Sequence, residues 1–124
     1  MLKQIVFPGW SLDDKPVPNH VLAWGILFSA MNNFPPGRTR EDTKRRNRVF
    51  RLVRDNLGEP GDGEMQFRMR LAGGSIQLDE AEFRDLNEAL TAARERLTLG
   101  VGDALEWLDD LLANAPAIDP NKKE

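Results

Sequence analysis

The sequence predicts an α+β fold in which a small antiparallel sheet, made of an N-terminal strand and a β-hairpin, packs with four helices in the order β-α-α-β-β-α-α. Residues 20–34 are apolar enough to form a helix that is buried on more than one side. Residues 64–71 alternate between apolar and polar side chains, as a half-buried strand does. We therefore expect one compact domain over residues 1–115, followed by a disordered tail over residues 116–124.

Composition excludes several classes of protein. The 124 residues include no Cys and one His, with a formal net charge of −3. The lack of Cys excludes thiol catalysis, disulfides and thiolate metal centres, and one His cannot supply a histidine-rich site, so we predict no cofactor and no metal. The N-terminus lacks the apolar region of a signal peptide, and no apolar run reaches the ~20 residues that span a bilayer. We expect a cytoplasmic protein without membrane contact.

The first strand is expected over residues 2–7, which are mostly apolar and stop at the turn signal Pro8-Gly9. We place this strand at the edge of the sheet. Prolines make the following segment a loop, and Asn19 is the expected N-cap of the next helix.

The helix predicted over residues 20–34 is the expected core of the domain. Leu22 and Ile26 lie on one side of it. The opposite, wider face is formed by Val21, Trp24, Leu27, Phe28, Met31 and Phe34. Because both faces are apolar, we expect both to be covered by other elements.

The next helix is expected over residues 40–57. Pro35-Pro36-Gly37 ends the core helix, and Thr39 is placed to accept a hydrogen bond from the backbone amide of Asp42, a capping pattern. Helical spacing predicts that this helix packs on the core helix through Val49, Phe50, Val53 and Leu57.

The C-terminal half is expected to hold the hairpin, over residues 65–78, and two helices. Ile76 and Leu78 should point inward on its second strand. Asp79 followed by Glu82 predicts the start of the third helix, and Asp103 followed by Glu106 predicts the start of the last. The third helix carries a narrow apolar seam made of Phe83, Leu86, Leu90, Ala93 and Leu97.

Residues with catalytic potential do not form a recognisable set. His20 has no Cys or His partner, and Ser29 lies about 13 Å away from it by helical rise. Neighbouring acids such as Asp109 and Asp110 are usually solvated rather than catalytic. The sequence has no phosphate-binding loop of the GxxxxGK type. We therefore predict no catalytic residue and a non-enzymatic protein.

Charge is unevenly distributed along the chain. Residues 38–56 hold eight Lys/Arg against three Asp/Glu, whereas residues 57–124 hold seven against fifteen. Such asymmetry indicates an anionic partner or internal pairing between the halves. Guanidinium groups favour phosphate and carboxylate because they bind them bidentately. The candidate partner- or anion-binding residues are the cations of the basic helix and of the hairpin: Arg38, Arg40, Lys44, Arg45, Arg48, Arg51, Arg54, Arg68 and Arg70.

Three interpretations of the basic helix follow. The favoured one is a small regulatory or adaptor protein that docks on an acidic protein surface through this helix, with the acidic last helix as a second contact. The alternative is DNA or RNA binding of a winged-helix-like type, with the hairpin as the wing. In the third, the arginines pair with acids of the chain itself, chiefly those at 103–110 and also Glu41, Asp42 and Asp55.

Overall fold

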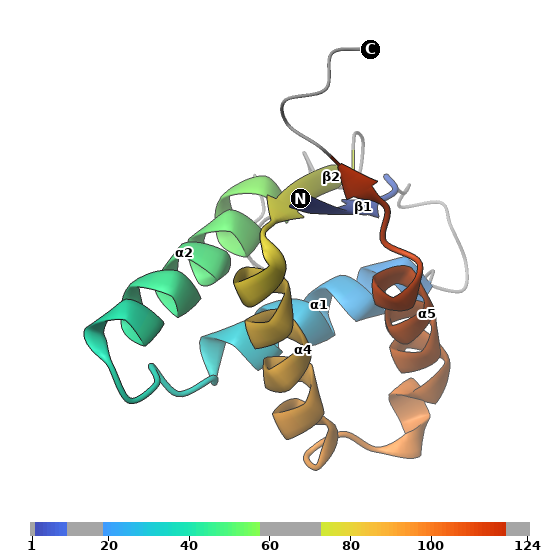
Figure 1. The fold of residues 1–124 in the computed structure, drawn as a ribbon. Coiled ribbons are helices and arrows are strands. Elements are labelled where there is room, and N and C mark those ends of the chain that lie inside the picture. The colour runs from blue at the N-terminus through green and yellow to red at the C-terminus, as the bar shows by residue number, and fades with distance from the viewer. Residues whose placement is uncertain (1, 10–18, 58–72, 119–124) are drawn as a thin grey trace.

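Four α-helices and one 3-10 turn pack with a small sheet in the residues that the computed structural model describes, 2–9, 19–57 and 73–118. The helices are α1 (Asn19–Asn32), α2 (Arg40–Leu57), α4 (Glu80–Arg94) and α5 (Gly102–Ala113), and the 3-10 turn is Leu99–Val101. Helix α1 lies at the centre and contacts the other three helices (Figure 1). The predicted α+β class with four helices is confirmed. Within these described ranges, no helix is long and apolar enough to cross a membrane.

The sheet has the strand order β2-β1-β3 and is antiparallel throughout. Strand β1 (Leu2–Phe7) pairs with β2 (Gly74–Leu78) on one side and with β3 (Ala117–Ile118) on the other. Ile5 is fully buried and Val6 is 48% exposed, because alternate side chains point to opposite faces of a strand. Strand β1 was expected at the edge, but β3 pairs with its second side and makes it the central strand of the described sheet.

Strand β3 comes from a part of the chain that we expected to be disordered. The backbone N–H of Gln4 donates to the carbonyl oxygen of Pro116 at 3.0 Å, and Leu2 lies opposite Ile118. Residues 116–118 are thus held by hydrogen bonds to the backbone of β1. The sequence of so short a segment does not predict this pairing. Residues 119–124 of the expected tail lie outside the described part.

The second strand of the predicted hairpin is β2, and it pairs with β1. Ile76 and Leu78 are buried on it, as expected. Gly73 precedes it with φ 70°, and a Cβ there would lie 2.2 Å from the carbonyl oxygen of Phe7, so this position requires glycine. The first strand of the hairpin, predicted over residues 64–71, falls outside the described residues.

Helix α1 is the core helix, as predicted, but it is not covered all round. Its buried residues include Trp24, Leu27 and Met31 on the wide face and Ile26 on the other. Leu22 is 43% exposed, which contradicts the expectation that both faces are covered. Ala93 of α4 and Leu97, which follows α4, line a pocket together with Ile26.

Helix α2 begins and packs as the sequence predicts. The Oγ1 of Thr39 accepts the backbone N–H of Asp42 at 3.0 Å, which confirms the expected cap. Val49 and Val53 are fully buried, and α2 packs against both α1 and β2. The ring of Phe50 lies 5.6 Å from that of Phe28 on α1. This packing fixes which side of α2 faces the interior.

The two C-terminal helices differ in how they begin. Asp79 and Glu82 form the capping box predicted for α4, and three residues of the predicted seam, Leu86, Leu90 and Ala93, are buried. Helix α5 begins at Gly102 instead of being capped by Asp103, and its first turn has no side-chain cap. The preceding 3-10 turn leads directly into α5, so Asp103 already lies inside the helix.

Candidate functional site

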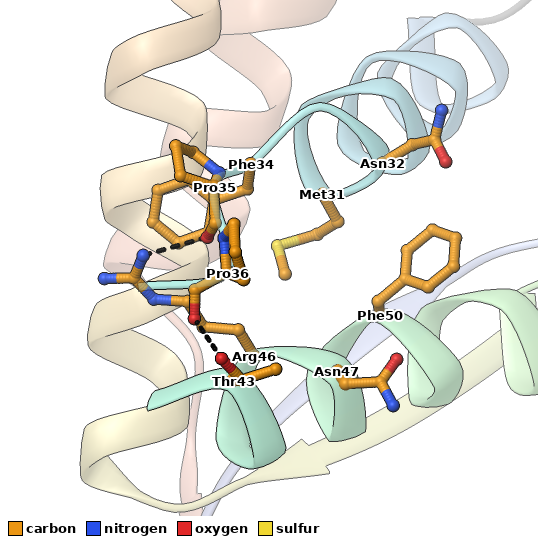
Figure 2. A pocket seen from close by; sticks show the side chains of 9 residues that line it. All are labelled: Met31, Asn32, Phe34, Pro35, Pro36, Thr43, Arg46, Asn47 and Phe50. Atoms are coloured by element: carbon orange, nitrogen blue, oxygen red, sulfur yellow. Dashed lines mark hydrogen bonds between the residues drawn. The ribbon is translucent and has the colours of Figure 1, made fainter. Parts of the chain in front are cut away.

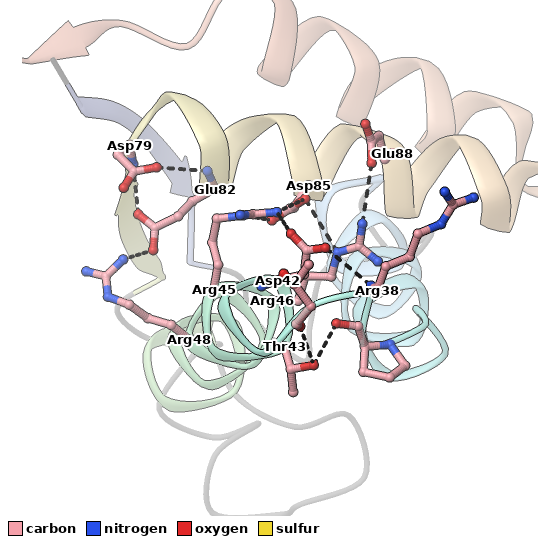
Figure 3. Close-up of polar contacts among 12 residues, drawn as sticks. Arg38, Asp42, Thr43, Arg45, Arg46, Arg48, Asp79, Glu82, Asp85 and Glu88 are labelled. Carbon is pink, nitrogen blue, oxygen red and sulfur yellow. Dashed lines mark hydrogen bonds and ion pairs between the residues drawn. The ribbon is translucent and has the colours of Figure 1, made fainter.

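The basic helix α2 directs three of its arginines at acidic side chains of α4 (Figure 3). Arg45 donates to Asp85 from Nε and Nη2, and Nη2 also donates to Asp42 at 3.0 Å. Asp85 is 1% exposed, so its carboxylate is separated from water. Such burial costs several kcal/mol unless a cation and hydrogen bonds replace the water. Arg45 supplies the cation and the hydrogen bonds and therefore has a structural role.

Arg46, which was not among the predicted candidates, is the most constrained cation of the helix. Its guanidinium carbon lies 4.2 Å from the centre of the Phe34 ring, and Nη1 donates to the carbonyl oxygen of Pro35 at 2.9 Å. Its Nε lies 3.5 Å from Asp85, and its Nη2 lies 3.8 Å from Glu88. Arg46 therefore ties α2 to α4 and to the segment that follows α1.

The third pair joins Arg48, whose side chain is 53% exposed, to Glu82, which is 3% exposed. Glu82 also accepts the backbone N–H of Asp79 at 2.9 Å, while Asp79 accepts the backbone N–H of Glu82 at 2.8 Å. The same carboxylate thus closes the capping box at the start of α4 and binds α2. Arg45, Arg46 and Arg48 are called the inner row below.

The electrostatics of this junction favour the charged forms of its members. The guanidinium of Arg45 and the backbone N–H of Arg38 hold the pKa of Asp42 below its ordinary value of 3.8. Hydrogen bonding to Asp85 raises the pKa of Arg45 further above the range of cellular pH. Because the charges of the inner row are already paired with acids, its role is to join α2 to α4.

A second set of cations on α2 stays in contact with solvent. Arg40, Lys44 and Arg51, called the outer row below, lie within about 40° of one another around the helix axis and span about 16 Å along it. All three are exposed, as is Arg38 just before the helix. Within residues 2–9, 19–57 and 73–118, none of these side chains has an ion pair. The predicted binding residues thus divide into two rows with different surroundings.

The remaining predicted residues do not extend the outer row. Arg54 pairs with its neighbour Asp55 at 3.0 Å, and its guanidinium carbon lies 5.9 Å from the centre of the Phe50 ring. Both charged groups are well exposed, so this pair contributes about 0–1 kcal/mol. Arg68 and Arg70 lie outside the described residues.

The acids that match α2 come from α4 and not from the last helix. The third interpretation placed internal pairing chiefly at residues 103–110, and for the described residues this placement is wrong. Asp109 pairs with Arg94 of α4, and no ion pair joins α2 to α5 in the described part of the chain. Helix α4 takes this role because it packs beside α2.

Residues suited to catalysis or metal binding do not gather in the described ranges. The ring of His20 lies 5.9 Å from that of Trp107 on α5, so the two side chains pack together. The Nε2 of His20 is buried and has no hydrogen-bond partner among the residues that the structure describes. Among the residues with described positions, no three His, Cys, Asp or Glu lie close enough together to hold a metal ion.

Comparisons with known proteins identify no relative. No protein-family model, no curated protein and no solved structure matches this chain. The division of α2 into an inner and an outer row is therefore the main guide to function.

Proposed function

We propose that this chain is a non-enzymatic regulatory or adaptor protein that docks on an acidic surface of a larger protein through the outer row of α2. The observation that carries this proposal is that Arg40, Lys44 and Arg51 are exposed on one side of the helix without partners in the described ranges, whereas the neighbouring inner row is matched. The outer row offers two forked guanidinium groups and one ammonium, which suit carboxylates on a partner.

The fold supports a docking role because the outer row stands on a rigid element. Helix α2 is attached to α4 by ion pairs to the buried carboxylates of Asp85 and Glu82, and it packs on α1 and β2, with Val49 and Val53 buried. Cations held on such a scaffold lose less conformational freedom on binding than cations on a loop. Reversing the outer row should therefore change binding without changing the fold.

Nucleic-acid binding by the same helix is the second candidate function. In its favour, the outer row follows one side of a helix, as phosphate contacts do, and Arg38 is exposed just before that helix. Against it, the inner row is already occupied by carboxylates, which leaves few cations for phosphates. Each phosphate contact contributes about −0.9 to the slope of log affinity against log salt, so these four cations give a slope no steeper than about −4.

Capture of the partner tests the proposal. The chain is used as bait in an extract of its native host at physiological salt, and bound proteins are identified by mass spectrometry. We expect the double variant Lys44→Glu/Arg51→Glu to lose the captured partner while its melting temperature stays unchanged, because charge reversal opposes an acidic surface.

The matched control is Arg84→Glu/Arg96→Glu, which makes the same change in net charge at exposed positions of α4 and just beyond it. This control should keep the partner. Equal loss in both variants would mean that net charge, and not the outer row, governs capture. Tight binding of duplex DNA with a slope near −4, lost in Lys44→Glu/Arg51→Glu, would favour the second candidate.

A further inference from the structure

A pocket of about 230 Å³ opens between the end of α1, the segment that follows it and the first half of α2 (Figure 2). Its apolar wall is formed by Met31, Phe34, Pro35, Pro36 and Phe50. Figure 2 shows Met31 on α1 and Phe50 on α2 among the side chains that line it. Apolar surface left open to water favours an occupant that removes it from water.

The walls of this pocket are fixed before any ligand arrives. The Oγ1 of Thr43 donates to the carbonyl oxygen of Pro36 at 3.0 Å, and Arg46 donates to that of Pro35 at 2.9 Å. The two prolines restrict the backbone between the helices. A preformed pocket binds more tightly than one that must be ordered on binding.

The charge inside the pocket does not call for an anion. Among the described residues, Arg46 is the one cation that lines it, and its guanidinium already lies near Asp85 and Glu88. The cations of the outer row, which have no ion pair in the described ranges, lie outside the pocket. Lys44 follows Thr43 in the chain, and Arg51 lies one turn beyond Asn47, and both Thr43 and Asn47 line the pocket. Apolar and cationic features therefore meet along one side of α2.

We propose that this pocket receives one apolar side chain of an acidic partner segment, while carboxylates on either side of that side chain pair with the outer row. The inference rests on the proposed function and names the kind of segment that the partner presents. Sites for drug-sized ligands occupy about 300–1,000 Å³, whereas a cavity of about 150 Å³ already holds benzene. The pocket thus has the size for a single side chain.

The probes are two short fluorescein-labelled peptides of Asp and Glu that differ at one central position, which is Phe in the first and Ala in the second. Fluorescence polarisation measures their affinity for the full chain. We expect the Phe peptide to bind about tenfold tighter or more, since burying an aromatic side chain contributes at least that factor. Both peptides should weaken with Lys44→Glu/Arg51→Glu.

The variant that tests the pocket itself is Asn32→Trp. Asn32 is exposed, lines the pocket from α1 and lies apart from the outer row, so the indole fills the space and leaves the cations in place. The matched control is Asn33→Trp, at the next residue, which lies beside Ala93 and Arg96 instead. Asn32→Trp should abolish the preference for Phe over Ala, and Asn33→Trp should keep it.

The outcomes separate the two proposals. Equal affinity of the wild type for both peptides, with loss of both in Lys44→Glu/Arg51→Glu, would overturn the pocket proposal and leave docking by the outer row standing. No binding of either peptide would overturn the pocket proposal, and the partner-capture experiment would then decide the proposed function.

A Phe preference that survives Asn32→Trp would place the apolar contact elsewhere and overturn this assignment. Displacement of the Phe peptide by duplex DNA at physiological salt would also overturn this assignment and would favour nucleic-acid binding.

Discussion

Neighbouring cations on α2 have different roles because they lie on different sides of the helix. Lys44 is exposed, whereas Arg45 binds the buried Asp85. The sequence contained part of this information: Arg45 and Arg46 lie four and three residues before Val49, on the flanks of the buried face. A cation on such a flank needs an acid on the element that packs there. The identity of that acid depends on tertiary packing, which helical spacing alone does not supply.

Replacing Asp85 tests how much the inner row contributes to the stability of the fold. We expect Asp85→Ala to lower the free energy of unfolding by about 3 kcal/mol or more, because Arg45 and Arg46 lose their buried carboxylate. The comparison is Glu88→Ala on the same helix, whose exposed side chain should change stability by less than about 1 kcal/mol. Urea denaturation measures both. A loss in Asp85→Ala no larger than that in Glu88→Ala would argue against a structural role for this ion pair.

The carboxylate of Asp42 should make stability depend on pH. Its pKa is lowered in the folded protein, chiefly by Arg45, so its ionised form stabilises the fold above the unfolded-state pKa, near 4. This contribution disappears as the pH falls through the lower, folded-state pKa. We therefore expect the wild type to be more stable than Asp42→Asn at pH 7, with the difference shrinking below pH ~4. Thermal unfolding between pH 7 and pH ~2 measures it, and a pH-independent difference would rule out this linkage.

Helices were more predictable from the sequence than the sheet. The bounds of α2 and the capping box at Asp79 follow from local signals, since a capping box needs only residues three apart. The position of β1 inside the sheet was missed, because it depends on pairing with Ala117–Ile118 at the far end of the chain. Local patterns cannot report a contact between two such distant segments.

Helix α1 provides a test at the scale of an element. Leu22 and Ile26 lie on the same side of it, yet Leu22 is 43% exposed and Ile26 is 8% exposed. We expect Ile26→Asp to unfold the domain, because it buries an unpaired charge, and Leu22→Asp to cost less than about 1 kcal/mol. Circular dichroism during thermal unfolding compares the two variants. Unfolding by Leu22→Asp would show that this face of α1 is covered after all.

Across the whole molecule, acids of the C-terminal half pair with some of the cations of α2 and leave others exposed. The sequence predicted both the charge asymmetry and the internal pairing as one of three interpretations, but it did not identify α4 as the acidic partner. Glu82, Asp85 and Glu88 match the inner row, and the outer row remains exposed. This division is what makes a docking role compatible with a stable fold, since binding can use one row without disturbing the other.

Equilibrium unfolding in urea of two double variants tests that division most directly. Lys44→Ala/Arg51→Ala removes two cations of the outer row, and Arg45→Ala/Arg48→Ala removes two of the inner row. We predict that the outer variant keeps the stability of the wild type to within about 0.5 kcal/mol, whereas the inner variant loses about 3 kcal/mol or more because Asp85 and Glu82 remain buried with fewer partners. Equal losses in the two variants, or a larger loss in the outer variant, would contradict the division of α2 into a structural row and a free row.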